Sequence, residues 1–230
     1  MKKIGLIGGT GPESTLVYYV QLNKAINVFL GGNEFPEIVI ESVNLGKALG
    51  LVAEEKYDEL TEYLGDAARH LENSGADIIA LTAGTMHVVY DQLKDKVTKP
   101  FISIPEVVGE YAINKGYKKV GLLGTIFTME KDFLKKSFLD RGVEVIVPEK
   151  AERELVNDII SNELEHGQAS AESERKLIDI IKRMKEENGI EAVVLGCTEL
   201  PLVIDDENSP VDVIDIMNVH IGKLVELAIK

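Results

Sequence analysis

The chain has 230 residues, of which 45% are hydrophobic and 28% are charged, as in ordinary globular proteins. Its 25 Lys and Arg against 39 Asp and Glu give a net charge of −14, which argues against long-range attraction to nucleic acid or to an anionic membrane. The single cysteine excludes an intrachain disulfide and any cysteine-rich zinc site.

Short runs rich in Ile and Val alternate with longer amphipathic stretches. Strands are predicted at 4–7, 37–42, 77–81, 101–104, 120–123, 143–147, 192–195 and 211–214. Helices are predicted at 13–28, 56–74, 86–94, 107–115, 131–141, 152–166, 171–188 and 218–229. The repeated order of strand and helix indicates an α/β fold with parallel sheets.

Three pairs of segments resemble each other in the same order and at nearly one offset. The pairs are 2–10 with 118–125, 75–81 with 189–195, and 100–104 with 210–214. This repetition predicts two pseudo-symmetric α/β domains whose sheets face an interdomain cleft. We place the first domain at 1–97 plus 210–230 and the second at 98–209.

The N-terminal segment does not read as a secretory signal, because glycines and Pro12 end its apolar run early. No stretch approaches the ~18 apolar residues that a membrane-spanning helix needs. We therefore expect a cytoplasmic protein whose partner is a small molecule, and neither a nucleic acid nor a membrane.

The turn Gly8–Gly11 comes after a predicted strand and precedes a predicted helix. Its spacing fits neither the dinucleotide-binding fingerprint nor a phosphate-binding loop. Backbone N–H groups at such a turn can hold a carboxylate, so Gly9 and Thr10 are candidate ligand-binding residues. The alternative is a tight turn without a ligand.

Cys197 lies just after the predicted strand 192–195, with Gly196 before it and Thr198 and Glu199 after it. We expect a helix to begin soon afterwards, which would lower the pKa of the thiol and supply a thiolate base or nucleophile. The alternative is an inert cysteine of the core.

Aligning the two repeats puts Ala83 opposite Cys197. Thr82 and Thr85 are then the nearest hydroxyls on that side, although a threonine is a far weaker acid and base than a thiol. His87, in the first turn of a predicted helix, is a candidate neutral donor to a ligand carboxylate. Simple structural hydrogen bonding is the alternative for all three side chains.

Thr125 and Thr128 come after another predicted strand and are candidate donors to a ligand, with helix capping as the alternative. Lys47 is a candidate carboxylate partner, with ordinary surface exposure as the alternative. The four histidines lack metal-ligand spacing, and we expect no metal site.

Four segments resemble the aspartate/glutamate racemase family: Ile4–Thr15, Thr85–His87, Gly124–Glu130 and Gly196–Glu199. The resemblance runs essentially end to end. It implies two pseudo-symmetric domains, a homodimer, and racemisation without pyridoxal phosphate or a metal. One cysteine removes the α-proton from one face and another returns a proton to the opposite face, while backbone N–H groups and hydroxyls hold the α-carboxylate.

The resemblance and the positions of the residues together give Cys197 as the catalytic thiol, with Thr82 and Thr85 as candidates on the side of the missing one. The candidate substrate-binding residues are Gly9, Thr10, Gly84, Thr85, His87, Thr125, Thr128, Thr198 and Lys47.

The chain departs from the family pattern at its first catalytic segment. That segment reads Cys-Asn-Thr or Thr-Asn-Thr in the family and Ala83-Gly84-Thr85 here, so an acid/base group and a substrate-binding asparagine are missing. A lysine of some aspartate-preferring members corresponds to Glu165, which weakens the case for a dicarboxylate substrate.

The leading hypothesis is an amino-acid racemase-like enzyme in which Cys197 is the surviving thiol and Thr82, Thr85 or a water replaces the other. Two alternatives stay open. One is a single-cysteine decarboxylase or isomerase of carboxylic acids, and the other is a non-catalytic amino-acid-binding relative.

Overall fold

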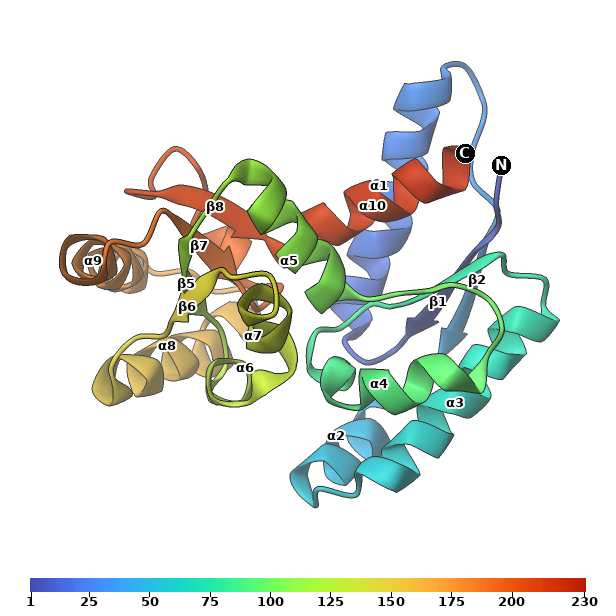
Figure 1. Ribbon diagram of the computed structural model, residues 1–230, viewed down its shortest axis with the longest axis horizontal. Helices are drawn as coiled ribbons and strands as arrows, with labels where there is room; N and C mark the ends of the chain where they lie inside the picture. The colour runs from blue at the N-terminus through green and yellow to red at the C-terminus, as the bar shows by residue number, and fades with distance from the viewer. The chain divides into compact units, whose positions relative to one another are not determined.

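The computed structural model describes all 230 residues, and their contacts divide the chain into two compact units. Unit 1 comprises Met1–Ile104 and His220–Lys230, and unit 2 comprises Pro105–Val219. Each unit contains one four-stranded parallel sheet with helices packed against it (Figure 1). The predicted α/β fold with two parallel sheets is confirmed.

The sheet of unit 1 has the strand order β2-β1-β3-β4. The elements from the N-terminus are β1 (Ile4–Gly8), α1 (Pro12–Leu30), β2 (Ile38–Ser42), α2 (Leu45–Ala53), α3 (Tyr57–Asn73), β3 (Ile78–Leu81), the 3₁₀ turn η1 (Thr85–Val89), α4 (Tyr90–Leu93), the 3₁₀ turn η2 (Lys94–Lys96) and β4 (Phe101–Ile102). Helix α5 (Ile104–Lys115) leads into unit 2, and α10 (Ile216–Ile229) returns to unit 1.

The sheet of unit 2 has the strand order β6-β5-β7-β8. Its elements are β5 (Lys119–Leu123), α6 (Ile126–Glu130), α7 (Asp132–Leu139), β6 (Glu144–Ile146), α8 (Lys150–Asn162), the 3₁₀ turn η3 (Leu164–His166), α9 (Ala171–Asn188), β7 (Ala192–Leu195), the 3₁₀ turn η4 (Leu200–Leu202) and β8 (Asp212–Asp215).

The two sheets repeat one topology, because β1, β3 and β4 occupy the same places in the first order as β5, β7 and β8 in the second. This agrees with the repeated segments of the sequence. The central strands β1, β3 and β7 are buried along their whole length, as expected for parallel strands covered on both faces. The loops that leave the C-terminal ends of these strands therefore lie at the carboxyl edge of each sheet.

All the predicted strands are present, and the differences concern helices and boundaries. Helices α2 and α6 were not predicted, and the predicted helix 86–94 is divided among η1, α4 and η2. The contact boundaries also differ from the expected ones at 97 and 210. Strand β4 pairs with β3 and so belongs to unit 1, whereas β8 pairs with β7 and belongs to unit 2.

Two fully buried histidines belong to the core of unit 1. The Nε2 atom of His220 donates to the Ile102 carbonyl (3.1 Å), so its Nδ1 accepts from the Tyr18 hydroxyl (2.7 Å). Burial, and secondarily the nearby His87, lowers the pKa of His220 to about 3. Burial likewise lowers the pKa of His87 to about 4. Both rings are therefore neutral in the folded protein.

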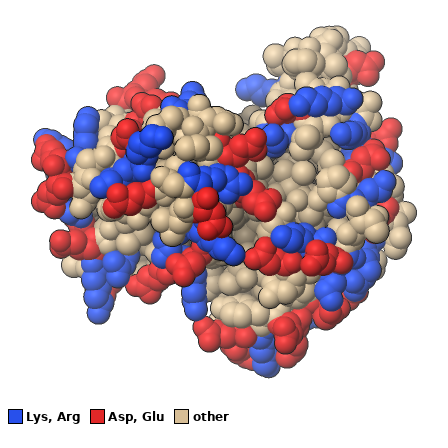
Figure 2. Space-filling view, viewed as in Figure 1, with Lys and Arg blue, Asp and Glu red and all other residues tan.

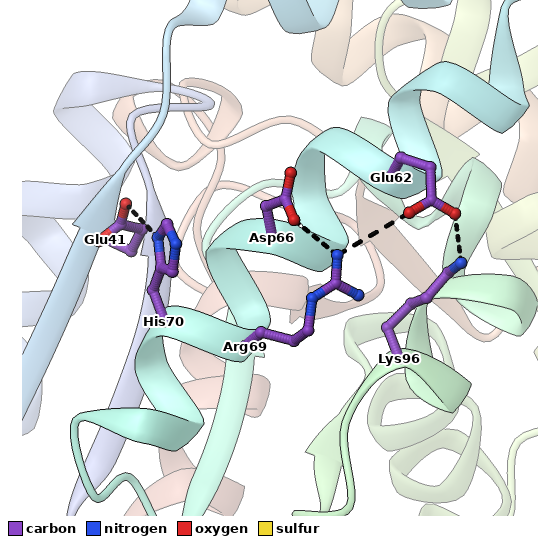
Figure 3. Close-up of polar contacts among 6 residues, drawn as sticks. All are labelled: Glu41, Glu62, Asp66, Arg69, His70 and Lys96. Carbon is purple, nitrogen blue, oxygen red and sulfur yellow. Dashed lines mark hydrogen bonds and ion pairs between the residues drawn. The ribbon is translucent and has the colours of Figure 1, made fainter.

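The surface of unit 1 carries a chain of ion pairs along α3. Arg69 lies 3.8 Å from Glu62, which also pairs with Lys96 of η2, and His70 Nδ1 lies 3.2 Å from Glu41 of β2 (Figure 3). These contacts connect α3 to its neighbours at both sides, although exposed pairs contribute little stability individually. Acidic and basic side chains are intermixed over the face in Figure 2. None of the helices is long and apolar enough to cross a bilayer.

The buried histidines predict a loss of stability in acid. The usual histidine pKa is 6.5, so both side chains bind a proton below that pH in the unfolded chain. In the folded chain, His87 stays neutral down to about pH 4 and His220 down to about pH 3. Each unit of difference is worth about 1.4 kcal/mol. The contribution of the two neutral histidines to the free energy of unfolding is therefore fully present above pH 6.5 and is lost as the pH falls below that value.

Urea unfolding at about pH 7 and about pH 4.5 measures this loss. His220→Gln should lower stability at neutral pH yet lose less on acidification than the wild type. His166→Gln, at an exposed site, is the matched control and should retain the wild-type pH dependence. An unchanged pH dependence in His220→Gln would contradict the assignment.

Candidate functional site

The carboxyl edge of the unit 2 sheet carries the only thiol of the chain. Cys197 lies two residues after β7, and its half-buried side chain packs against the core of unit 2. Its Sγ donates a hydrogen bond to Oε2 of Glu199 at 2.8 Å. The Thr198 hydroxyl donates to the other oxygen, Oε1, at 2.7 Å. The Glu199 carboxylate thus accepts hydrogen bonds from two of the predicted site residues, Cys197 and Thr198.

The expected helix after Cys197 is absent, and the prediction of a lowered thiol pKa is wrong. Only the three-residue 3₁₀ turn η4 is found there, and it begins at Leu200. Burial first, then the charge of Glu199 and its hydrogen bond, and last the charge of Glu165, raise the pKa of the Cys197 thiol. The resting side chain is therefore a thiol, and a proton acceptor must take its proton before it acts as a base.

Glu199 is a candidate site residue that the sequence pattern did not single out. A carboxylate two residues from a cysteine was visible in the sequence, but the turn that aims both side chains at each other was not. Exposed Glu165, in η3 after the end of α8, contributes a second negative charge to the same region. The surroundings of the thiol are therefore acidic.

Thr125 and Thr128 perform local structural roles. Thr125 is the N-cap of α6, where its hydroxyl accepts from the Thr128 amide (3.3 Å) and lies 3.2 Å from the Thr128 hydroxyl. This corresponds to the capping alternative. Gly196 packs so closely on this pair that an added Cβ would lie 2.9 Å from the Thr128 methyl and from the Leu123 carbonyl oxygen. The backbone leading to Cys197 therefore requires glycine.

The carboxyl edge of the unit 1 sheet begins with the turn after β1. Gly9 has a positive φ of 77°, and a Cβ there would lie 2.3 Å from the Val43 carbonyl oxygen. Its N–H donates to the Thr15 hydroxyl (3.0 Å), which favours the alternative of a tight turn without a ligand. Thr10 differs, because its buried hydroxyl has no hydrogen-bond partner. Since buried polar atoms are normally paired, this hydroxyl is a ligand-binding candidate.

Thr82 is engaged within unit 1. Its buried hydroxyl lies 3.2 Å from the Thr15 hydroxyl and 3.3 Å from the Ile7 carbonyl oxygen. Its one proton is therefore already directed at internal acceptors, which favours a structural role. Ala83, the counterpart of Cys197, is half-buried and carries no polar side chain, and half-buried Thr85 lies at the start of η1.

The structure gives both ring nitrogens of His87 backbone partners. Its Nε2 accepts from the Ile104 amide (3.1 Å), so the ring proton lies on Nδ1, which is 3.1 Å from the carbonyl oxygens of Ala83 and Gly84. Both ring nitrogens are satisfied by backbone groups. His87 thus connects the loop 83–84 to the start of α5, which favours the structural alternative for this side chain.

Lys47 lies on the exposed face of α2, with its Nζ 3.9 Å from the centre of the Tyr63 ring. This cation–π contact gives it a surface role. No group of three or more His, Cys, Asp and Glu side chains is arranged to hold a metal ion. The site residues with chemistry still available are Cys197 with Glu199 in unit 2, and Thr10 and Thr85 in unit 1.

Comparison with known proteins gives this geometry a context. The model of the Asp/Glu/Hydantoin racemase family matches residues 7–224. An aspartate racemase homologue from Pyrococcus horikoshii OT3 is 40% identical, with all of both chains covered and a TM-score of 0.90. A candidate Asp/Glu racemase from Yersinia pestis is 33% identical over all of both chains, with a TM-score of 0.96.

A curated relative of lower identity also carries a racemase name. The broad specificity amino-acid racemase RacX of Bacillus subtilis is 26% identical over 221 residues, 92% of each chain. The family match spans nearly the whole sequence and includes both sheet edges described above. The chain belongs to the Asp/Glu/hydantoin racemase family.

Proposed function

We propose that this protein is an amino-acid racemase-like enzyme that moves the α-proton of a free amino acid, with Cys197 as its acid and base and no cofactor. The observation that carries the proposal is the hydrogen bond of 2.8 Å between the Cys197 thiol and the Glu199 carboxylate. A thiol beside a carboxylate is a proton donor coupled to a proton acceptor. Family membership and the activity named for RacX support the reaction type.

The proposed step balances as two proton transfers. The thiol proton passes to Oε2 of Glu199, leaving a thiolate and a carboxylic acid. The thiolate then takes the α-proton, the electron pair of the C–H bond remains on the substrate as an enolate-like carbanion, and the thiol is restored. The proton on the thiol then exchanges with water. Its return to the same face gives isotope exchange at Cα and leaves a thiolate, which recovers its proton from Glu199. Delivery of a proton to the opposite face gives inversion, and the Glu199 proton then passes to water.

The acidic surroundings favour a substrate that brings a positive charge. Glu199 and Glu165 raise the pKa of the thiol, and an α-ammonium group near them offsets their charge and makes the thiolate more accessible. A second carboxylate on the substrate would be repelled by the same groups. We therefore propose amino acids with uncharged side chains as better substrates than aspartate or glutamate.

Inversion also needs a second proton donor, which the family pattern assigns to the first catalytic segment, and in this chain that segment offers little. Ala83 carries no acid, and the Thr82 hydroxyl is engaged by Thr15 and Ile7. Thr85 or a water is then the donor, and the loss of a positioned acid/base group costs roughly 10²- to 10⁴-fold in rate. We expect exchange at Cα to be faster than racemisation.

The presence of only one thiol supports a second candidate function. With one thiol and an alanine at the paired position, the site suits decarboxylation or isomerisation of a carboxylic acid, in which a carbanion is protonated from one face only. The non-catalytic alternative, an amino-acid-binding relative, predicts ligand-induced thermal stabilisation without any exchange of the α-proton.

Cys197→Ser should reduce α-proton exchange by ~10²-fold or more, because a hydroxyl is a much weaker acid than a thiol. The measurement is proton NMR of candidate amino acids in deuterated buffer, with optical rotation recorded in parallel. Exchange that persists at the wild-type rate in Cys197→Ser would remove this residue from the mechanism.

Glu199→Gln should change thiol ionisation and turnover in opposite directions. Removing the carboxylate lowers the pKa of the Cys197 thiol, so alkylation by iodoacetamide at mildly alkaline pH should accelerate. Turnover should fall, because the acceptor of the thiol proton is lost. Thr198→Val, which removes the neighbouring hydrogen bond to Glu199, serves as the control for the alkylation rate alone, because Thr198 is itself a substrate-binding candidate. Slower alkylation in Glu199→Gln would contradict the assigned pair.

Restoring the missing group should speed racemisation. The double variant Ala83→Cys with Gly84→Asn rebuilds the family pattern in unit 1, and we expect it to raise the ratio of inversion to exchange by ~10-fold or more. Ala83→Ser, similar in size but a much weaker acid, is the matched control. A ratio that does not change in the double variant would argue that unit 1 takes no part in proton transfer.

A further inference from the structure

A cavity of about 340 Å³ lies within unit 2, where α5 passes β8 (Figure 1). Its volume falls within the range of about 300–1,000 Å³ that is usual for small-molecule sites. The side chains that line it include two tyrosines, two aspartates and a lysine: Tyr111 and Lys115 of α5, Tyr117 of the loop after α5, Asp206 of the loop before β8, and Asp212 of β8. None of them belongs to the buried core or to the proposed catalytic site.

The cavity lies at the edge of the unit 2 sheet that is opposite to Cys197. Asp212 is the first residue of β8 and pairs with Ala192, the first residue of β7. Cys197 comes two residues after the other end of β7. The length of this strand, about 10 Å at roughly 3.3 Å per residue, therefore separates the cavity from the thiol. A ligand in the cavity would not compete for the proposed catalytic group.

Two oriented carboxylates border the cavity. Asp212 accepts a hydrogen bond from the Tyr117 hydroxyl through Oδ2 (2.5 Å), and Asp206 accepts one from the Val213 amide through Oδ1 (3.0 Å). Each carboxylate keeps its other oxygen for a ligand, and neither forms an ion pair with a side chain of the protein. Positioned carboxylate oxygens of this kind bind an ammonium group by charge-assisted hydrogen bonds.

The pKa of the Tyr117 hydroxyl shows that these groups lie close together. Burial raises this pKa first, followed by the hydrogen bond to the Asp212 carboxylate and the charge of that group. The charges of Tyr111 and Asp206 raise it further. Four side chains from three separate segments of unit 2 therefore converge at the cavity.

A lysine borders the same cavity without a carboxylate partner. The Nζ atom of Lys115 lies 5.5 Å from the centre of the Tyr111 ring, and this lysine forms no ion pair. The cavity thus presents unpaired charges of both signs. A ligand with two positive groups would be repelled by Lys115, and a ligand with two negative groups would be repelled by the two aspartates.

The remaining lining suits an uncharged side chain. The rings of Tyr111 and Tyr117 border the cavity, and so do Pro210 and Val211. Aromatic rings and aliphatic groups gain free energy by covering apolar surface, but they offer no partner to a third charge. The best match is therefore a small molecule with one ammonium group, one carboxylate and an apolar remainder.

We propose that this cavity binds a free α-amino acid with an uncharged side chain. The ammonium group contacts the available oxygens of Asp206 and Asp212, the carboxylate contacts the Lys115 ammonium, and the side chain lies against the tyrosine rings. The ligand class is the one that the proposed reaction uses, but binding here requires neither Cys197 nor turnover.

Heteronuclear NMR of the whole protein tests the proposal, with the amide signals of Tyr117 and Val213 as local reporters. L-Leucine should shift both signals with a dissociation constant in the millimolar range or below. Isoamylamine lacks only the carboxylate of leucine, and isocaproate lacks only its ammonium group, so each should bind at least about 10-fold more weakly. Equal binding of leucine and either analogue would overturn the assignment of a zwitterion. No shift of either signal at tens of millimolar leucine would overturn the site itself.

Two variants separate the two charges. Lys115→Gln should weaken leucine binding by about 10-fold or more and leave isoamylamine binding unchanged, because only the carboxylate loses its partner. Asp212→Asn, which keeps an acceptor for the Tyr117 hydroxyl, should weaken leucine and isoamylamine alike. The matched controls are Lys118→Gln and Asp179→Asn, which change exposed charges of unit 2 outside the cavity and should bind leucine like the wild type.

A Lys115→Gln variant that loses leucine and isoamylamine to the same extent, or that binds leucine like the wild type, would contradict the proposed orientation of the ligand. The α-proton exchange that tests the proposed function is recorded separately. Exchange depends on Cys197, whereas the shifts of Tyr117 and Val213 depend on the cavity, so the failure of one proposal is distinguishable from the failure of the other.

Discussion

The proposed chemistry of this protein depends on one hydrogen bond, from the thiol of Cys197 to the carboxylate of Glu199. Without the carboxylate, a half-buried thiol at the end of a strand would be an ordinary core side chain. With it, the thiol has a proton acceptor at contact distance, and the same negative charge raises its pKa. The thiol is therefore protonated at rest, and in the proposed mechanism a positively charged substrate group shifts the equilibrium toward the thiolate.

The two units show how one scaffold diverges at equivalent positions. In unit 2, Gly196 lies against the Thr128 methyl, and the backbone then presents a thiol. In unit 1, the corresponding residue is Thr82, whose hydroxyl joins Thr15 and the Ile7 carbonyl in an internal cluster. The amide of Gly196 and that of Thr82 make the same bond to the neighbouring strand, to Leu123 and Ile7 respectively. The backbone is thus kept, while the side-chain chemistry remains in one half.

Strand positions and topology could be predicted from the sequence because buried parallel strands appear as short Ile- and Val-rich runs. Helix α2 was missed because its two glycines hide the pattern, although Asn44 caps it. The contacts of the candidate site were harder to predict. That His87 is satisfied by the Ile104 amide depends on contacts between residues far apart in sequence. The lowered pKa predicted for the Cys197 thiol relied on a helix after this residue, where the structure has only the turn η4. The pKa is raised in part by the Glu199 carboxylate, whose orientation is determined only by the folded turn.

The path of the chain between the units has a consequence for synthesis on the ribosome. Unit 2 is one continuous stretch, whereas unit 1 is completed only by its last residues, His220–Lys230. His220 closes a buried contact with Tyr18, and the Ala228 carbonyl accepts from the Lys2 amide. The N-terminal sheet emerges first but lacks part of its core until α10 has been synthesised. Unit 2 can therefore fold completely before α10 is available to complete the core of unit 1.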